Sequence, residues 1–225
     1  MREMGIIPED AQLPSSGNTP WNEVSEEDRK ELAFRRAIYA AQIDSMDQNI
    51  GRIVRSLRKN GQLENTLILF LSDNGCSAEE GMFGYQFETN RIANFEEWRT
   101  ASKRSSSQGK AWANASNVPF REYKKDVHEG GSRTPLIAHW PARIKDAGGL
   151  RHDAGHIIDI MATACEIGSA EMPEGARGLS LSPTFDGNPL EGREALYWEH
   201  EGNRAIRVGD WKLVSRFAAG KRGAW

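Results

Sequence analysis

Residues 66–75 read TLILFLSDNG, an apolar run that ends in an aspartate, an asparagine and a glycine. The run over residues 66–72 is rich in Leu and Ile and does not alternate, which fits a strand covered on both faces, as in a parallel sheet. Asp73, Asn74 and Gly75 are all typical of turns. A carboxylate and a carboxamide at the tip of a strand also suit a hard cation such as Ca²⁺ or Mg²⁺. These ten residues alone leave both interpretations open.

The segment before this strand predicts a long amphipathic helix. Ser25 is followed by three acidic residues, a pattern typical of a helix N-terminus, and Asn60-Gly61 is a pattern typical of a helix end. Between them, apolar side chains recur at steps of three and four and form one stripe: Tyr39, Ile43, Met46, Ile50, Ile53 and Leu57. A helix, a short loop and a buried strand are half of a βαβ unit, so the fold class is predicted to be α/β.

The rest of the chain predicts two parts. Residues 76–118 are polar and read as a long functional loop, residues 134–140 as a second buried strand, and residues 154–168 as a short helix. The later segments ALYWEHE, RAIRVGD and WKLVSRF suggest an antiparallel meander. We therefore expect an α/β domain over residues 1–190, with an extended arm over 1–24. Residues 191–225 are expected to begin a small antiparallel C-terminal subdomain that is truncated.

Composition and motifs exclude several classes of protein. The 225 residues carry a formal charge of −3, which gives no electrostatic footprint for nucleic acid or an anionic membrane. No apolar run reaches the roughly 18 residues that span a bilayer, and residues 1–14 contain no apolar segment of a signal peptide. The five histidines and two cysteines show no zinc-site spacing, and no P-loop, GxGxxG or GxSxG motif occurs.

A second candidate for chemistry is the charged segment PFREYKKDVHEGGSRTP, residues 119–135. Gly130 and Gly131 permit a close approach of backbone to backbone. The segment also carries cations that suit an anionic substrate, namely Arg121, Lys124, Lys125 and Arg133. Read alone, it is equally described as a solvated loop with a glycine turn.

Three stretches together resemble the sulfatase family of the alkaline-phosphatase-like superfamily. They are YAAQIDSMDQNIGRIVRSLRKNGQLENTLILFLSDNG, WANASNVPFREYKKDVHEGGSRTPLIAHWP and WEHEGNRAIRVGDWKLV, in that order over roughly residues 30–215. The resemblance implies the covered α/β sheet of that superfamily, followed by the start of a small antiparallel subdomain. It also implies that the chain corresponds to the C-terminal half of such a protein.

The resemblance assigns roles to three residues. Asp73 and Asn74 match the aspartate and asparagine that bind the family's divalent cation, usually Ca²⁺, with Mg²⁺ as the other candidate. Lys124 matches the lysine that precedes the EGG element by five positions and contacts the substrate sulfate, as a catalytic and substrate-binding residue. Lys125 is the adjacent alternative, and the spacing favours Lys124. The EGG element, residues 129–131, is assigned a structural role.

One part of the family pattern has no match. The family's nucleophile is formylglycine, made from Cys or Ser within C/S-x-P-x-R, and neither Cys76 nor Cys165 lies in such a motif. The paired aspartates that supply further metal ligands have no counterpart either. The resemblance therefore implies that a missing N-terminal half is needed to complete the site and that this fragment alone is inactive.

The activity implied by the resemblance is that of an arylsulfatase-like sulfuric ester hydrolase, with a small-molecule or carbohydrate sulfate ester as substrate. A phosphodiesterase or phosphonate monoester hydrolase of the same superfamily is the alternative enzyme, and an inactive, non-enzymatic remnant is the alternative of another class. The segment WEHEGNRAIR favours a sulfatase. In the loop over 76–118, Trp112, Asn114 and Asn117 are expected wall residues of the substrate pocket. The family suggests a periplasmic or secreted location and leaves a cytoplasmic one open.

Overall fold

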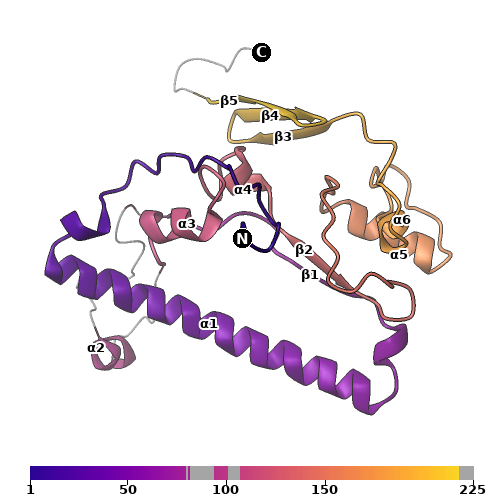
Figure 1. Cartoon of the computed structure of the whole chain (residues 1–225), viewed down its shortest axis with the longest axis horizontal. Helices are drawn as coiled ribbons and strands as arrows, with labels where there is room; N and C mark the ends of the chain where they lie inside the picture. Colours follow the sequence, from indigo (N-terminus) through magenta and orange to yellow (C-terminus); the bar gives the residue numbers. More distant parts are fainter. Residues whose placement is uncertain (80, 82–93, 101–106, 218–225) are drawn as a thin grey trace.

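The computed structural model describes residues 1–79, 81, 94–100 and 107–217 (Figure 1). Helices and strands of both kinds follow one another along this part of the chain. The helical elements are η1 (Trp21–Glu23), α1 (Glu26–Lys59), η2 (Leu63–Asn65), α2 (Phe95–Thr100), α3 (Lys110–Asn117), α4 (Glu129–Ser132), α5 (Asp159–Ile167) and α6 (Ser182–Phe185). The strands are β1 (Ile68–Leu71), β2 (Leu136–His139), β3 (Leu196–His200), β4 (Asn203–Val208) and β5 (Trp211–Ser215). The predicted mixture of helix and strand is confirmed.

The long helix α1 begins and ends where the sequence predicts. The hydroxyl of Ser25 accepts a hydrogen bond from the backbone N–H of Asp28 at 3.1 Å, which satisfies one amide of the first turn. At the other end, the N–H of Asn60 bonds back to the Ser56 carbonyl, and Gly61 has a φ of 68°. A glycine takes this left-handed conformation without strain, so the helix ends here at little cost in conformational energy.

The apolar stripe of α1 is not covered within the described part of the chain. Ile43, Met46 and Ile53 are 42%, 45% and 61% exposed. Burial is instead concentrated near the start of the helix, where Leu32 is 1% exposed and Arg35 is buried beside Glu31. The predicted stripe is therefore present on the helix, but its central part faces no described element.

The two strands β1 and β2 pair antiparallel, so the predicted parallel arrangement is wrong for this pair. Leu71 lies opposite Leu136, and Ile68 lies opposite His139. A hydrogen bond next to the strands fits this direction: the hydroxyl of Thr134, just before β2, donates to the carbonyl of Ser72, just after β1, at 2.6 Å. The start of β2 is thereby held beside the end of β1, and the chain runs back along it. Both strands are also only partly covered, since Phe70 is 41% exposed.

The predicted short helix over residues 154–168 starts later than the sequence suggests. In the structure α5 begins at Asp159, whose fully buried carboxylate accepts the backbone N–H of His156 at 2.7 Å. Residues before Asp159 therefore lie outside the helix, and Ile157 and Met161 are about half exposed. The same carboxylate accepts a hydrogen bond from Arg193 at 2.5 Å and so links α5 to the chain just before β3.

The three C-terminal strands form the predicted antiparallel meander. Their order is β3-β4-β5, and Arg207 of β4 lies directly opposite Lys212 of β5. Ala205 on the same face of β4 is buried, whereas Tyr197 and Trp211 on the other face are 70% and 84% exposed. Figure 1 shows this sheet beside α4. The domain bounds at residues 24 and 190 stay predictions.

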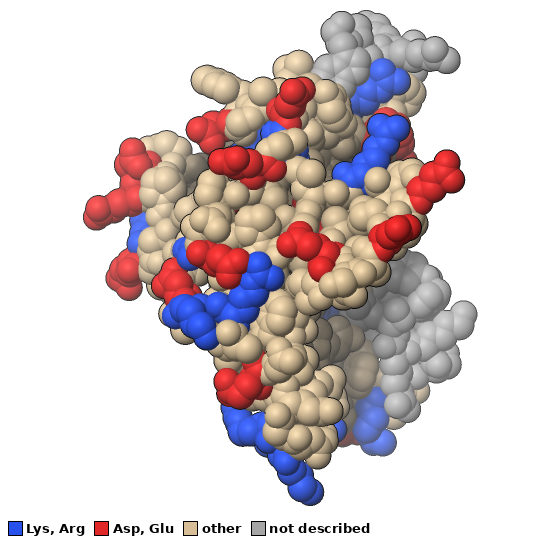
Figure 2. Space-filling view, turned by 90° about the vertical axis from the view of Figure 1, so that its right-hand side faces the viewer, with Lys and Arg blue, Asp and Glu red and all other residues tan. Residues whose placement is uncertain are grey.

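The surface and the helices add two general findings. On the described part of the face in Figure 2, acidic and basic side chains are interspersed, and the basic ones form no continuous patch. Among the described residues, no helix combines the length and the apolar character that a membrane crossing requires.

Candidate functional site

The bend at Asp73 and Asn74 is not closed by hydrogen bonds from its own side chains. In an Asx turn, the Asp73 side chain would accept the backbone N–H two residues on. Here the N–H of Gly75 donates to the Gly131 carbonyl at 3.0 Å, and the N–H of Cys76 donates to Asn117 Oδ1 at 3.0 Å. Within the described residues, the side chains of Asp73 and Asn74 have no hydrogen bond or ion pair, so their oxygens remain available to a ligand.

The bend packs against the charged loop that the sequence singled out, residues 119–133. The N–H of Gly75 bonds to Gly131, and the N–H of Lys124 bonds to the Cys76 carbonyl at 3.1 Å. Asn117 ties the same two segments, since its Nδ2 donates to the Glu122 carbonyl at 3.1 Å while its Oδ1 accepts from Cys76. The structure therefore brings the backbone at Asp73–Asn74 and the backbone at Lys124 together, although 50 positions separate them in the sequence.

Three glycines make this close approach possible. A Cβ added to Gly75 would lie 1.7 Å from the carbonyl oxygen of Gly130, and one added to Gly130 would lie 2.0 Å from that of Glu122. A Cβ at Gly131 would lie 1.9 Å from the carbonyl oxygen of Asp126. Each contact is with backbone, which cannot rotate away as a side chain can. The structural role predicted for the EGG element is confirmed.

The two adjacent lysines of the loop have different surroundings. Lys125 has a φ of 79° and its ammonium lies 3.3 Å from the carboxylate of Glu79. Lys124 is exposed, and its ammonium has no ion pair within the part of the chain that the structure describes. Of these two lysines, only Lys124 therefore has an ammonium without an ion pair among the described residues, and its assignment as the substrate-binding lysine stays a prediction.

The acidic side chains of the loop meet the C-terminal sheet, a set of contacts that sequence reasoning missed. Glu129 accepts hydrogen bonds from Lys212 at 2.8 Å and from Arg207 at 3.3 Å. Burial raises the pKa of Glu129, but the Lys212 hydrogen bond and the nearby cations outweigh it and leave the pKa below its ordinary 4.5. Arg216 binds the carboxylates of Glu122 and Asp126. The alternation of side chains along β4 and β5 predicted strands, but it did not indicate which residues of the loop their cations would contact.

His128 lies between these charges and is held in its neutral form. Burial lowers its pKa below the ordinary 6.5, and the guanidinium of Arg216 adds to the effect. The hydrogen bond to Asp126 at 3.3 Å acts in the opposite direction, and Arg121 acts with Arg216. The imidazole is therefore a reporter of how closely the loop is packed against the sheet.

This surrounding predicts a pH dependence of stability. Because the folded pKa of His128 lies below 6.5, the unfolded chain binds more protons as the pH falls below that value, and the free energy of unfolding decreases. The contribution is fully present above 6.5 and is lost as the pH falls through the folded pKa. Urea unfolding at pH values of about 7.5 and 5.5 should show a weaker pH dependence in His128→Gln. Equal pH dependence in both chains would contradict this environment.

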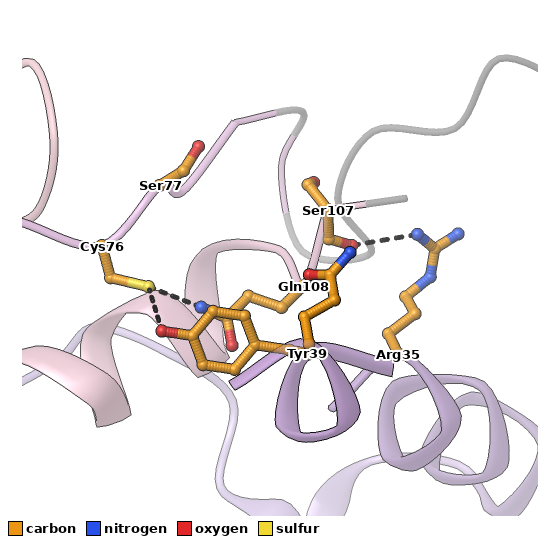
Figure 3. Close-up of a pocket in the computed structure, with 7 residues that line it drawn as sticks. Arg35, Tyr39, Cys76, Ser77, Ser107 and Gln108 are labelled. Atoms are coloured by element: carbon orange, nitrogen blue, oxygen red, sulfur yellow. Dashed lines mark hydrogen bonds between the residues drawn. The ribbon is translucent and has the colours of Figure 1, made fainter. Parts of the chain in front are cut away.

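A cavity of about 210 Å³ lies on the other side of Cys76 (Figure 3). Its wall comes from α1, from the chain after β1 and from the chain before α3. The lining residues are Arg35, Tyr39, Gln42, Cys76, Ser77, Ser107 and Gln108. In Figure 3 the thiol of Cys76 points toward the Tyr39 hydroxyl, 3.9 Å away, and Gln108 Nε2 donates to the same sulfur at 2.5 Å. Polar groups thus surround a pocket next to the bend.

The three residues expected to line a substrate pocket do not line this cavity. Trp112 packs its ring against Trp21, with centroids 5.5 Å apart, and its indole N–H donates to the Leu32 carbonyl. Asn117 is engaged with backbone groups, as described above, and neither it nor Asn114 lines this cavity. Tyr39 does line it, and burial raises its pKa above 10, with Cys76 acting in the same direction. Trp112 and Asn117 therefore join the segment around α3 to neighbouring parts of the chain.

The candidate metal ligands fit a hard cation in chemistry but not in number. Asp73 and Asn74 offer oxygen atoms, the donors that Ca²⁺ and Mg²⁺ take. A Ca²⁺ ion takes six to eight oxygen ligands, so two residues supply only part of a shell. Among the described residues, no group of three or more His, Cys, Asp or Glu side chains is arranged to hold a metal. Asp73 and Asn74 are therefore candidates for one part of a metal site.

The sulfatase family model matches residues 15–168. This match covers more than half of the 225 residues, and the chain therefore belongs to the sulfatase family. The matched region contains the bend after β1 and the whole Lys124 loop. The predicted family is confirmed.

Curated relatives and solved structures agree. An uncharacterized sulfatase of Schizosaccharomyces pombe is 28% identical over 95% of this chain and 42% of its own length. An arylsulfatase of Klebsiella aerogenes is 32% identical over 63% of this chain and 31% of its own length. The crystal structure of Ps i-CgsB in complex with k-i-k-neocarrahexaose is 25% identical, with a TM-score of 0.59 over 88% of this chain and 39% of that one. The chain thus has the sulfatase fold and spans less than half the length of these relatives.

Proposed function

We propose that this chain is part of an enzyme that hydrolyses organic sulfate esters and releases inorganic sulfate. One observation carries the proposal. The chain just after Asp73 and Asn74 is joined by backbone hydrogen bonds to the loop with Lys124, which supports assigning the oxygen donors and the ammonium to one site. A hard cation and a lysine ammonium both interact favourably with the anionic oxygens of a sulfate group.

Lys124 is proposed to bind the sulfate group. Its ammonium is exposed and without an ion pair among the described residues, so it can donate charge-assisted hydrogen bonds to sulfate oxygens. As the ester bond breaks, negative charge shifts toward the leaving oxygen, and a fixed ammonium stabilises the changed distribution. Its backbone N–H, bound to the Cys76 carbonyl, keeps the start of this side chain in place.

Asp73 and Asn74 are proposed to hold a divalent cation, with Ca²⁺ as the first candidate and Mg²⁺ as the second. When bound, such a cation polarises the sulfate oxygens and favours the ionised form of a nucleophile. The contribution of this chain is to keep the two side chains free, because the neighbouring amides of Gly75 and Cys76 are bonded elsewhere.

The nucleophile is proposed to be a formylglycine outside these residues. No Cys or Ser of the chain lies in C/S-x-P-x-R. We therefore expect residues 1–225 alone to show negligible sulfatase activity and to need a complementary segment that carries this motif and further metal ligands. A non-enzymatic remnant of the family is the competing proposal.

The organic part of the substrate is proposed to be a carbohydrate or an aryl group. The first is supported by the neighbour of known structure that binds a neocarrahexaose, and the second by the arylsulfatase relative. The polar cavity beside Cys76 lies close along the chain to Asp73 and Asn74, on the same segment after β1. This placement agrees with either group.

The test compares the two lysines in a protein that joins this chain to a segment carrying C/S-x-P-x-R. Replacing Lys124 by alanine should lower kcat for p-nitrophenyl sulfate on the order of 100-fold to 1000-fold, because a preorganised contact to developing charge is lost. The matched control is Lys125→Ala, whose ammonium pairs with Glu79 and whose loss should change kcat little. Asp73→Ala should lose both bound metal and activity, whereas Lys124→Ala should keep its metal.

Three outcomes would count against the proposal. An active Lys124→Ala beside an inactive Lys125→Ala would move the substrate contact to the other lysine. Turnover of p-nitrophenyl sulfate by residues 1–225 alone would show that the nucleophile lies within the chain. A higher kcat/KM for a phosphonate monoester or a phosphodiester than for the sulfate ester would favour the alternative hydrolase of the superfamily.

A further inference from the structure

We propose that Lys212 on β5 and Arg216 just after β5 are positioning residues that orient the Lys124 loop. The inference rests on the proposed role of Lys124 and adds a set of ion pairs that fixes the orientation of the loop carrying this lysine. Both residues follow the family-matched region, which ends at residue 168. They act on the loop through its acidic side chains and, among the described residues, form no hydrogen bond or ion pair with Asp73 or Asn74.

The charges of the loop are sorted between two neighbours. Its carboxylates, on Glu122, Asp126 and Glu129, each pair with a cation on β5 or just after it, in addition to their pairs with neighbouring side chains of the loop itself. Its two lysines do not take part in these pairs, since Lys125 pairs with Glu79 after the bend and Lys124 has no ion pair among the described residues. The acidic side chains of the loop are therefore attracted to the C-terminal sheet, whereas Lys124 takes no part in these pairs.

Lys212 is the most constrained of these cations. Its side chain is only 8% exposed, and its ammonium contacts three groups at once. It donates to Glu129 Oε1 at 2.8 Å and to Ser132 Oγ at 2.7 Å, and it lies 4.3 Å from the centroid of the Trp198 ring. Two of its N–H groups are used in hydrogen bonds to α4 and its charge lies over an aromatic ring, so small rotations of α4 break contacts.

The energetics favour a role in orientation over a role in global stability. Burial lowers the pKa of Lys212 despite the opposing effect of Glu129, which means that the ammonium pays a desolvation cost. Buried ion pairs of this kind add little net stability, but removing one partner leaves an uncompensated charge. Such a pair fixes the geometry of α4, and the hydrogen bond from the N–H of Gly130 to the carbonyl of Arg121, at 2.8 Å, passes that geometry on to the loop.

Arg216 acts on the other end of the loop. Its guanidinium is 51% exposed and binds Glu122 together with Asp126, at 3.3 Å for the latter. Glu122 is held with a φ of 67°, two residues before Lys124. The same guanidinium faces His128, so the imidazole reports whether Arg216 is in place.

The test measures amide hydrogen exchange in residues 1–225 and needs no catalytic turnover. In Lys212→Met, exchange of the Lys124 N–H and of the other bonded amides in residues 121–131 should become about tenfold faster, since the loop opens locally. Lys212→Arg should restore slow exchange, because it keeps the charge and the donors. The matched control is Arg204→Met, which removes a cation from the opposite face of β4 and should leave loop exchange unchanged.

Arg216→Met keeps the inference testable if Lys212→Met does not fold, because Arg216 is half exposed. This variant should raise the pKa of His128, measured by NMR titration of the imidazole. Unchanged exchange at Lys124 in folded Lys212→Met would overturn the inference, as would equally faster exchange over the whole chain. If Lys212→Met is unfolded, an unchanged His128 titration in Arg216→Met overturns it. Kinetics of Lys124→Ala test the proposed function separately, so the two failures are distinguishable.

Discussion

Replacing Gly130 by alanine is expected to cost more than about 4 kcal/mol of unfolding free energy or to abolish folding of the loop. The new Cβ would lie 2.0 Å from the carbonyl oxygen of Glu122 and 2.5 Å from that of Arg121. Both neighbours are backbone atoms, and Gly130 itself donates its N–H to the Arg121 carbonyl. The backbone must therefore move, and the Lys124 loop must leave the bend after β1. Urea denaturation gives the loss of stability, and amide exchange shows where it occurs.

The matched control is Gly51→Ala in the interior of α1. There the new Cβ would lie 3.2 Å from the end of the flexible Arg55 side chain, which can move aside. Alanine is favoured over glycine in a helix by about 1 kcal/mol, so this variant should be as stable as the parent or more stable. A Gly130→Ala chain with parental stability and slow exchange at Lys124 would mean that the close packing of bend and loop is wrong.

Replacing Asp159 by alanine is expected to destabilise the chain by about 3–5 kcal/mol. Its carboxylate is fully buried and is the shared acceptor for the N–H groups of His156 and Leu179 and for Arg193. Without it, the guanidinium of Arg193, which is 12% exposed, stays in place without its partner. Thermal or urea unfolding of the variant measures the loss directly.

Two further variants make this prediction specific. Asp159→Asn keeps the shape and one acceptor oxygen but removes the charge, so it should lose less stability than alanine. Asp44→Ala removes an exposed carboxylate from α1 and should have little effect, because its hydrogen bond to Gln48 lies at the surface. A loss in Asp159→Ala no larger than in Asp44→Ala would show that this buried pair is not formed.

The sequence predicted those parts of the fold that depend on interactions between residues close together in the chain. Ser25 and Asn60-Gly61 marked both ends of α1, since capping involves residues within one turn. The pairing of β1 with β2 was predicted in the wrong direction, because it depends on a contact between Thr134 and Ser72 across 62 positions. The start of α5 was placed too early for a similar reason, since Asp159 binds groups as distant as Arg193.

In the candidate site as well, residues within short motifs were predicted, and residues that depend on distant contacts were not. Asp73, Asn74 and Lys124 were named from short motifs, and the structure brings their segments together without testing their chemistry. Lys212 was not named, because its partner Glu129 lies 83 positions earlier and a lysine on a short strand has many ordinary explanations. The availability of Asp73 also needed the structure, since it depends on where the amide of Gly75 finds its acceptor.

The carboxylates of the Lys124 loop depend on cations elsewhere in the chain, which limits how the loop can be transplanted into another protein. A graft of residues 119–133 onto another scaffold would carry three carboxylates and leave behind their partner cations on β4, on β5 and just after β5. Such a graft would keep every letter of the motif and still present the lysine in no fixed direction. A working transplant has to take the C-terminal hairpin along, or replace the three acids with neutral side chains.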